Sequence, residues 1–263
     1  MVVNMSKKLQ RANKIIEILK EKNGASVKEL ASILQVSEMT IRRDLNVLKA
    51  NNIVKNVYGA TIYNPLNNIQ KLSNPYNITE EIIKNESEKF RIGQIAAKLI
   101  QPDDIIIIDT GTTTEKLAQS ISDDIKLTAL LYNINILTAL KMKPNVNLIF
   151  SGGYFHPNTQ MFESPEGISL IENTRATKVF VSAAGIHEQL GVTCSNNYEV
   201  PTKRAIIGSS LKKILMADSQ KFGMVKSSYF ADLNEFDIII TDSGISKEWI
   251  NYINDLGIRL IIA

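Results

Sequence analysis

The chain has 263 residues, of which 44% are hydrophobic and only 6% aromatic, which is enough to bury a largely aliphatic core and favours one large domain joined to a small one. A single cysteine excludes an internal disulfide, and with only two histidines no cluster of metal ligands is expected. No signal sequence opens the chain, and apolar runs such as residues 105–108 fall far short of the ~20 residues that span a bilayer. We therefore expect a soluble protein of the reducing cytoplasm.

The net charge is only +3, but it is unevenly distributed. Residues 1–63 contain 11 Lys and Arg against 5 Asp and Glu, a net of +6, whereas the remainder contains 19 against 22, a net of −3. A small basic part joined to a slightly acidic larger part points to a polyanion-binding domain at the N-terminus. A solvated basic surface would give the same count, so charge alone leaves both interpretations open.

Two helices are predicted at the start of the chain. Apolar residues recur at helical spacing over residues 9–19, and Gly24 marks the expected end of this first helix. Ser26 is followed three residues later by Glu29, which is the pattern of a capping box. A second short helix is therefore expected to begin immediately after Ser26.

The third predicted helix spans residues 37–49, with Ser37 as its N-cap and Ile41, Leu45 and Leu48 on its buried face. Hydroxyl, guanidinium and amide groups on a helix that is anchored from behind can reach base edges and phosphates in a major groove. The polar face of this helix carries such groups at Thr40, Arg42, Arg43 and Asn46, and Ser37 at its start is counted with them as a candidate DNA contact. The alternative is an ordinary surface helix, with a solvated arginine pair and with Asp44 as an intrahelical partner.

A β-hairpin wing is predicted over residues 53–63, where apolar and polar residues alternate around Gly59. Lys55 and Tyr58 in this wing are expected to contact the DNA backbone or the minor groove, which positions a protein on DNA without reading its sequence. A basic three-helix unit with a wing favours duplex DNA binding over a protein-interaction module. The N-terminal domain is thus predicted to be a winged helix-turn-helix over residues 1–63.

The sequence VSEMTIRRDLN at residues 36–46 closely resembles the signature of the DeoR family of bacterial transcriptional regulators. The resemblance covers nearly the whole chain and implies a repressor with a winged head and a body that senses a sugar phosphate. Such a head reads few bases, so two heads on symmetric half-sites of operator DNA are expected, which implies a homo-oligomer.

Residues 64–80 are rich in Pro and Asn without sustained periodicity, which predicts a linker. From residue 81 to residue 263, helical and strand patterns alternate, which predicts an α/β domain with a largely parallel sheet. The candidate strands are residues 105–109, 126–131, 146–150, 178–182, 214–217, 237–241 and 259–262.

Ligands of such sheets bind where strands end, so the loops after strands are the candidate site. The loop from Asp109 to Thr114 contains Gly111 and Thr hydroxyls before a helix predicted over residues 115–121, which is an arrangement that suits an anion. It contains neither a P-loop nor a dinucleotide motif, and threonines that merely cap a helix need no ligand. The other small-residue loops are Gly152-Gly153 and residues 182–185.

Three charged residues lie near these loops. Glu199 and Lys203 are four residues apart and so share one helical face; the alternative is a surface ion pair that contributes roughly 0.3–0.5 kcal/mol. Lys221 follows a predicted strand directly, where a phosphate monoester would need a cation. His156, His187 and Cys194 are expected in loops, where local hydrogen bonds or solvent usually satisfy a histidine.

The body also resembles the family's effector domain, which is similar to ribose-5-phosphate isomerase. The resemblance implies that Thr112, Thr113 and Thr114 hold a phosphate, and that Glu199, Lys203 and Lys221 face sugar hydroxyls or the phosphate. The full set of implied effector residues is Asp109, Gly111, Thr112, Thr113, Thr114, Gly152, Gly153, Ala184, Gly185, Glu199, Lys203 and Lys221. Neither a metal nor a cofactor is expected.

The sequence departs from the isomerase at residues 182–185. The isomerase carries an Asp-Gly-Ala-Asp loop there, whereas this chain has Ser-Ala-Ala-Gly, which supplies no ionisable group for proton transfer. Binding without turnover is therefore expected, and the alternative is a sugar-phosphate isomerase with an appended nucleic-acid-binding head. Residues 127–132, 182–187 and 192–194 resemble one subgroup of the family, which implies deoxyribose 5-phosphate as the effector.

Overall fold

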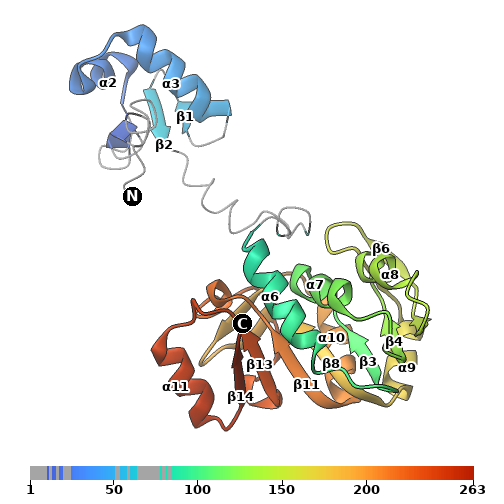
Figure 1. The fold of residues 1–263 in the computed structure, drawn as a ribbon. Coiled ribbons are helices and arrows are strands. Elements are labelled where there is room, and N and C mark those ends of the chain that lie inside the picture. The colour runs from blue at the N-terminus through green and yellow to red at the C-terminus, as the bar shows by residue number, and fades with distance from the viewer. Residues whose placement is uncertain are drawn as a thin grey trace. The chain divides into compact units, whose positions relative to one another are not determined.

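The computed structural model describes residues 84–263 without a break and, before them, residues 11, 14, 15, 18, 19, 25–50, 54–57, 60–63, 78 and 81. The chain divides into two compact units, Met1–Asn74 and Pro75–Ala263, drawn in Figure 1. The boundary falls within the linker predicted over residues 64–80, of which only Ile78 belongs to the described residues. Each unit is considered by itself below.

The N-terminal unit contains the predicted capping box and wing. Helix α2 (Val27–Leu34) begins after Ser26, whose side chain accepts the Glu29 N–H while the Glu29 carboxylate accepts the Ser26 N–H. Helix α3 (Glu38–Ala50) follows, and the Ser37 hydroxyl accepts the N–H of Thr40 at 3.3 Å. Strands β1 (Val54–Val57) and β2 (Ala60–Tyr63) pair antiparallel. Residues 11, 14, 15, 18 and 19 of the first predicted helix are helical.

One small apolar core holds this unit together. Ile15 and Leu19 from the first helix pack with Leu30 of α2, with the inner face of α3 and with Val54 of β1. The inner face of α3 consists of the predicted residues Ile41, Leu45 and Leu48. Burial of this stripe leaves Arg42, Arg43 and Asn46 exposed on the opposite side of α3.

The C-terminal unit is built on a seven-stranded sheet in the order β14-β13-β11-β8-β3-β4-β5, and every pairing in it is parallel. All seven strands predicted from the sequence are present. Their bounds are β3 Ile105–Ile108, β4 Leu127–Leu131, β5 Val146–Phe150, β8 Ala176–Ser182, β11 Ser210–Met216, β13 Ile238–Thr241 and β14 Arg259–Ile262. Strand β11 begins earlier than predicted because its first residues include two lysines, one exposed and one half-buried, which hide the apolar pattern.

Helices cover both faces of this sheet, because successive strand residues point to opposite sides. Ile106 and Ile108 pack beneath α6, α7 and α8, whereas Ile107 lies in the other core cluster with α9, α10 and α11. The helix bounds are α6 Glu86–Ala97, α7 Thr112–Ser120, α8 Ile134–Leu140, α9 Pro165–Asn173, α10 Glu199–Gly208 and α11 Lys247–Asp255, with short 3-10 turns η1 Ser219–Lys221 and η2 Leu233–Glu235. The predicted α/β architecture is confirmed.

Two small antiparallel sheets were not predicted. Strands β6 (Tyr154–His156) and β7 (Met161–Glu163) form one, and β12 (Ser228–Ala231), β10 (Gly191–Cys194) and β9 (Gly185–His187) form the other. His156, His187 and Cys194 therefore lie in strands, and their predicted placement in loops is wrong. These strands are only three or four residues long, too short for alternation to be recognised in the sequence.

The strand order reverses between β3 and β8. From β3 the chain proceeds outward through β4 and β5, and from β8 it proceeds in the opposite direction through β11, β13 and β14. The loops that leave the carboxyl ends of β3 and β8 therefore diverge and leave a crevice, which is where open α/β sheets bind ligands. No described helix combines the length and apolarity that a membrane-spanning segment requires.

Candidate functional site

The outer face of α3 carries the residues predicted to contact DNA. Arg42, Arg43 and Asn46 are exposed, and the half-buried Thr40 has its hydroxyl 2.9 Å from the hydroxyl of Ser37. Arg42 lies 3.3 Å from Glu38, but both side chains are exposed, and such an ion pair contributes little. Both guanidinium groups are therefore available to a polyanion.

Asp44 does not act as the intrahelical partner considered above. It is 3% exposed, and its carboxylate accepts a hydrogen bond from Arg11 Nε at 2.5 Å. This hydrogen bond raises the pKa of Arg11, with the charge of Asp44 acting in the same direction and burial opposing both. Asp44 thus ties α3 to the first helix of this unit, which contains Arg11, and helps to orient the polar face.

The remaining predicted DNA contacts are in the wing. Lys55 lies in β1, although its side chain is not among those described, and Tyr58 lies outside the described residues. Met39 was overlooked because only polar side chains were considered. It is 71% exposed at the start of α3, and an apolar side chain there suits contact with a thymine methyl group.

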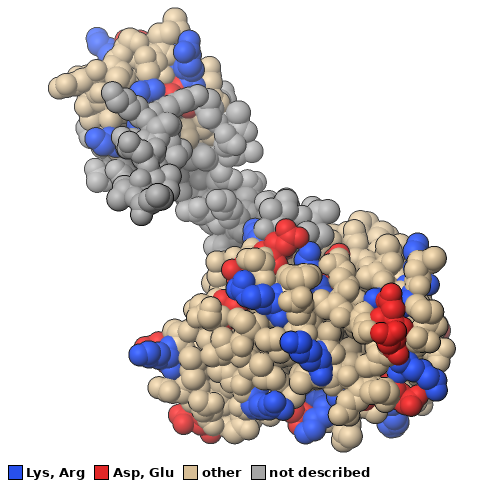
Figure 2. Space-filling model, in the orientation of Figure 1, with Lys and Arg blue, Asp and Glu red and all other residues tan. Residues whose placement is uncertain are grey.

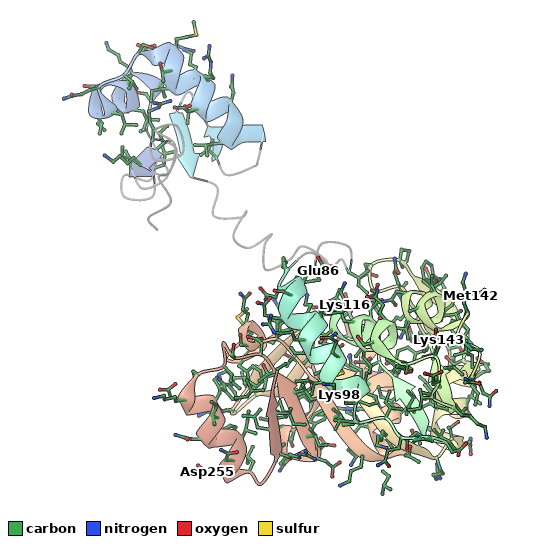
Figure 3. All side chains as sticks on the ribbon, in the orientation of Figure 1. Glu86, Lys98, Lys116, Met142, Lys143 and Asp255 are labelled. Atoms are coloured by element: carbon green, nitrogen blue, oxygen red, sulfur yellow. The ribbon has the colours of Figure 1, made fainter. Side chains whose placement is uncertain are left out.

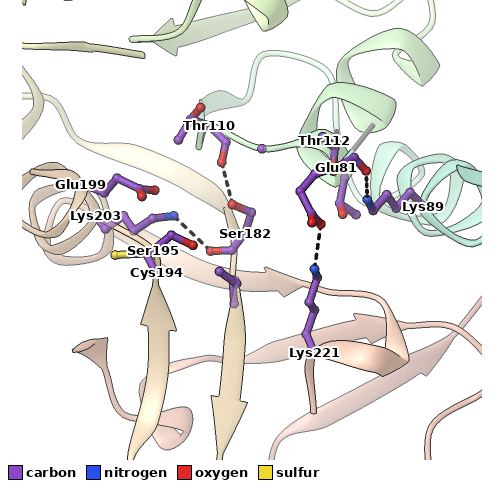
Figure 4. Close-up of a pocket in the computed structure, with 14 residues that line it drawn as sticks. Glu81, Lys89, Thr110, Thr112, Ser182, Cys194, Ser195, Glu199, Lys203 and Lys221 are labelled. Atoms are coloured by element: carbon purple, nitrogen blue, oxygen red, sulfur yellow. Dashed lines mark hydrogen bonds and ion pairs between the residues drawn. The ribbon is translucent and has the colours of Figure 1, made fainter. Parts of the chain in front are cut away.

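The C-terminal unit contains a pocket at the strand-order reversal (Figure 4). The free space between its lining residues is about 450 Å³, a volume that includes open solvent. We call this space the C-terminal pocket. It is lined by the loops after β3 and β8, by the first turn of α7, by residues from α6, β10, α10 and η1, and by Glu81. The lining residues are Glu81, Lys89, Thr110, Gly111, Thr112, Thr113, Ser182, Ala183, Ala184, Cys194, Ser195, Glu199, Lys203 and Lys221.

One wall of the pocket is held by Asp109, which is completely buried. Its Oδ1 accepts the Tyr132 hydroxyl, and its Oδ2 accepts Lys203 Nζ at 2.5 Å and the N–H and hydroxyl of Ser182 at 2.8 and 3.1 Å. Burial, reinforced by the charge of Asp109, raises the pKa of Tyr132 well above its ordinary value, so the phenol stays protonated and donates. Asp109 therefore supports the pocket from behind and does not line it.

Lys203 and Glu199 both line the pocket and are nearly fully buried, so the alternative of a surface ion pair is wrong. Lys203 pairs with Asp109 and donates to the Ser182 carbonyl at 3.1 Å. Burial would lower the pKa of Lys203, but the carboxylates of Asp109 and Glu199 outweigh it and raise the pKa. The folded protein therefore favours the ionised form of the Lys203 ammonium.

Glu199 accepts two hydrogen bonds on Oε1, from the N–H and the side-chain amide of Asn196 at 3.1 and 2.8 Å. No described residue donates to Oε2. Burial raises the pKa of Glu199, although Lys203 and Asn196 oppose this. A buried carboxyl with one unused oxygen in a pocket suits a ligand hydroxyl.

The opposite side of the pocket is formed by the start of α7. Gly111, Thr112 and Thr113 line it, and no side chain caps the first turn of the helix. The uncapped N–H groups and the helix dipole favour an anion. A Cβ at Gly111 would lie 2.7 Å from Ser182 Oγ, so only glycine lets the two loops approach this closely.

Three lysines surround one carboxylate at this end of the pocket. The Glu81 carboxylate lies 3.0 Å from Lys221 Nζ and 2.5 Å from Lys84 Nζ, and the Glu81 carbonyl accepts Lys89 Nζ at 2.6 Å. Figure 4 shows Glu81 and Lys221 pointing toward one another. Burial lowers the pKa of Lys89 to about 8, although the charge of Asp218 opposes the shift.

Lys89 and Glu81 were not predicted as site residues. Lys89 carried a detectable signal, because with Ile92, Gly93 and Ala96 it forms the buried stripe of α6, and a lysine on such a stripe calls for an explanation. Glu81 showed no such signal in the sequence, because it lies before the first helical pattern of the C-terminal unit. Its position is decided by tertiary contacts alone.

Several predicted effector residues lie outside the lining. Thr114 donates its hydroxyl to the Gly111 carbonyl, and Gly185 pairs within the small sheet of β9 and β10. Gly152 and Gly153 follow β5, which is two strands away from β3 in the sheet. A Cβ at Gly153 would lie 2.4 Å from the Glu163 carbonyl, so this glycine allows close packing against β7.

Each of the two units matches a known protein domain family. Residues 11–65 match the DeoR-like helix-turn-helix domain, and residues 84–243 match the DeoR C terminal sensor domain. The chain belongs to the DeoR family. It is thus a DNA-binding regulator with a C-terminal sensor domain, and the fold predicted for both parts is confirmed.

Named relatives of this DeoR-family chain align over nearly its whole length. The deoxyribose operon repressor of Escherichia coli (strain K12) is 32% identical over 96% of this chain and 97% of its own. HTH-type transcriptional regulator GolR of Listeria innocua is 33% identical over 97% and 98%, respectively. These relatives are named as regulators, not as enzymes.

Solved structures resemble the sensor domain only remotely. Ribose 5-phosphate isomerase a from Methanocaldococcus jannaschii has a TM-score of 0.40 and 11% sequence identity, over 53% of this chain and 55% of its own. At this distance the likeness concerns the fold alone and carries no functional argument.

Proposed function

We propose that this DeoR-family protein is a cytoplasmic bacterial repressor that holds operator DNA through α3 and releases it when a phosphorylated sugar enters the C-terminal pocket. The single observation that carries the proposal is the composition of that pocket, which has a cationic end and a carboxyl end. Lys89, Lys221 and the uncapped start of α7 lie at one end, and Glu199 and Lys203 lie at the other.

These two ends suit the two parts of a sugar phosphate. Ammonium groups and helical N–H groups bind phosphate oxygens, whereas a buried carboxylate oxygen accepts sugar hydroxyls. Deoxyribose 5-phosphate is the favoured effector, supported by the alignment with a deoxyribose operon repressor. A homodimer or larger homo-oligomer would place two α3 helices on symmetric operator half-sites.

The face of the sensor unit shown in Figure 2 supports the assignment of DNA contact to the N-terminal unit. Lys and Arg are scattered over this face, with Asp and Glu among them, and mostly uncharged residues lie between them. The distribution agrees with the net charge of −3 that residues 64–263 carry. Duplex binding depends mainly on cations concentrated along one path, which α3 provides with adjacent arginines.

Binding without turnover is favoured over isomerisation because of the loop after β8. Ser182, Ala183 and Ala184 line the pocket there and supply no ionisable group. Asp109, the acid that Ser182 contacts, has both oxygens occupied by Tyr132, Ser182 and Lys203. An aldose–ketose assay with pentose phosphates should detect no conversion, and turnover that depends on Glu199 would support the isomerase instead.

Arg43→Ala should weaken operator binding by about 1–3 kcal/mol, because it removes an exposed guanidinium from the DNA-facing side of α3. The measurement is a gel-shift titration with a duplex that the wild-type protein selects from a random library. Arg259→Ala, an exposed arginine on β14 of the sensor unit, is the matched control and should bind like wild type. Equal affinity of the two variants would remove Arg43 from the interface.

Lys221→Ala should abolish the response to the effector while leaving DNA binding intact. A thermal-shift screen of pentose and hexose phosphates should raise the Tm of wild type by about 5–10 °C at 100 times the Kd. The variant should show no shift, since it lacks the cation that lines the pocket. Lys212→Ala, at the far end of β11 and 55% exposed in its side chain, is the control. A normal shift in Lys221→Ala would contradict the assignment.

A further inference from the structure

The cationic end of the C-terminal pocket already contains an anion supplied by the chain itself. Glu81 lines the pocket, its side chain is only 17% exposed, and its carboxylate contacts both Lys221 and Lys84. Burial by itself would raise the pKa of Glu81, but hydrogen bonds and charges from the two lysines outweigh it and hold the pKa at about 2. The carboxylate is therefore ionised at neutral pH.

Glu81 binds two lysines of the pocket at the same time. Its carboxylate accepts a hydrogen bond from Lys221 Nζ at 3.0 Å, and its main-chain carbonyl accepts one from Lys89 Nζ at 2.6 Å. Lys89 is 1% exposed, and no carboxylate of a described residue forms an ion pair with it. Any movement of Glu81 away from the pocket would therefore free both ammonium groups together.

The single negative charge of Glu81 does not balance the positive charges of the lysines around it. Lys84, Lys89 and Lys221 surround it, and among the described residues the carboxylates of the buried Asp218 and of the exposed Glu86 also act on Lys89. Asp218 uses Oδ1 for the Asn85 side chain at 2.9 Å, and its Oδ2 has no hydrogen-bond partner among described groups. A phosphate monoester carries about −1.5 to −2 charges at neutral pH and would neutralise the three lysines better than one carboxylate does.

Glu81 also lies in the segment that leads to the DNA-binding unit. The boundary between the two units falls between Asn74 and Pro75, and α6 begins at Glu86. Within this short stretch Ile78 is buried and its N–H donates to the Asn158 carbonyl at 2.9 Å. Glu81 and Ile78 thus anchor the connecting segment to the pocket and to the turn before β7.

We propose that the Glu81 carboxylate is an internal anion at the phosphate end of the C-terminal pocket, and that an incoming phosphate displaces it and loosens the segment connected to the DNA-binding unit. The inference rests on the proposed function, since it assigns a regulatory role to a residue of the same pocket. It also supplies the difference in ligand contacts between two states that any effector-driven release requires. In the empty state Glu81 holds Lys221 and Lys89, and in the filled state phosphate holds them.

The first test measures the affinity for inorganic phosphate by calorimetry with the full-length protein. Glu81→Gln keeps the shape of the side chain but removes its charge, so phosphate should bind about tenfold more tightly than to wild type, because no anion competes for the site. Glu86→Gln is the matched control. Glu86, which is labelled in Figure 3 at the start of α6, forms an ion pair with Lys116 at 2.9 Å and does not line the pocket.

Three outcomes of this test are distinguishable. Tighter binding by Glu81→Gln, with Glu86→Gln within about twofold of wild type, supports the displacement. Wild-type binding that Lys221→Ala abolishes but Glu81→Gln leaves unchanged would keep the proposed anion site and overturn the displacement. Absence of phosphate binding in both wild type and Glu81→Gln would overturn the displacement and the proposed phosphate site together.

The second test needs no variant of Glu81. Hydrogen exchange of wild-type protein is followed with and without inorganic phosphate, on peptides that cover Glu81. Displacement predicts faster amide exchange there when phosphate is bound, because the contacts to Lys221 and Lys89 are lost. Slower exchange would mean that phosphate binds beside an undisturbed Glu81, and that result would overturn the inference.

Discussion

Lys203→Met should destabilise the sensor unit by about 3–5 kcal/mol and lower its Tm by roughly 10 °C. Lys203 and Asp109 are 2% and 0% exposed in their side chains, and the substitution leaves the Asp109 carboxylate buried without its cation. The Ser182 carbonyl loses a donor at the same time. The measurement is urea unfolding followed by circular dichroism at constant pH.

A double-mutant cycle separates the ion pair from other effects of this substitution. Asp109→Asn keeps the size of the side chain and removes the charge, so the double variant should recover part of the lost stability. Lys212→Met, on the exposed beginning of β11, is the control and should change stability by less than about 0.5 kcal/mol. A loss in Lys203→Met no larger than in this control would refute the role of the buried pair.

Lys89→Met should have the opposite effect on stability while removing phosphate binding. Lys89 is 1% exposed, and burial holds its pKa at about 8, below its ordinary value of 10.5. Its ionised form is therefore less favourable in the folded protein than in the unfolded chain. Methionine has a similar shape and no charge, so we expect a gain of about 1–2 kcal/mol after the loss of the hydrogen bond to the Glu81 carbonyl.

The pH dependence of this gain has a definite sign. Between about pH 8 and 10.5 the unfolded chain binds a proton at Lys89 that the folded protein does not, so wild-type stability rises with pH relative to the variant. The advantage of Lys89→Met should thus be complete below about pH 8 and disappear toward pH 10.5. Urea unfolding at several pH values measures it, and calorimetry with inorganic phosphate measures the binding loss. A variant that is no more stable than wild type, or that still binds phosphate, would contradict this prediction.

Sequence patterns predicted an element correctly where that element depends on residues close together in the chain. The capping box of Ser26 and Glu29 depends on residues three apart, and the buried stripe of α3 depends on the helical period. The same holds for the strands of the large sheet, because a strand buried on both faces is a continuous apolar run, such as that from Ile105 to Ile108. Short strands such as β9 have no such run and could not be found in this way.

The candidate pocket was only partly predictable. Small residues that follow strands identified Thr112 and Ser182, because parallel strands end at one edge of the sheet. The same reasoning also suggested Gly152 and Gly153, which do not line the pocket. The sequence does not reveal the order of strands in the sheet, and β5 lies two strands away from β3. Sheet order is a property of the packed domain.

The sequence by itself determined the two-part architecture and the face of α3 that carries Arg42 and Arg43, because helical period and strand patterns act over short stretches of chain. The prediction that Thr112, Lys203 and Lys221 share one effector site came from the resemblance to the DeoR family. Only the tertiary structure decided which charges meet. Lys203 pairs with Asp109, which is 94 residues away, and Lys221 pairs with Glu81, which is 140 residues away. Such pairs depend on how β3, β8 and the segment before α6 come together, and burial then fixes which ammonium groups are held by an internal carboxylate and which are left for a ligand.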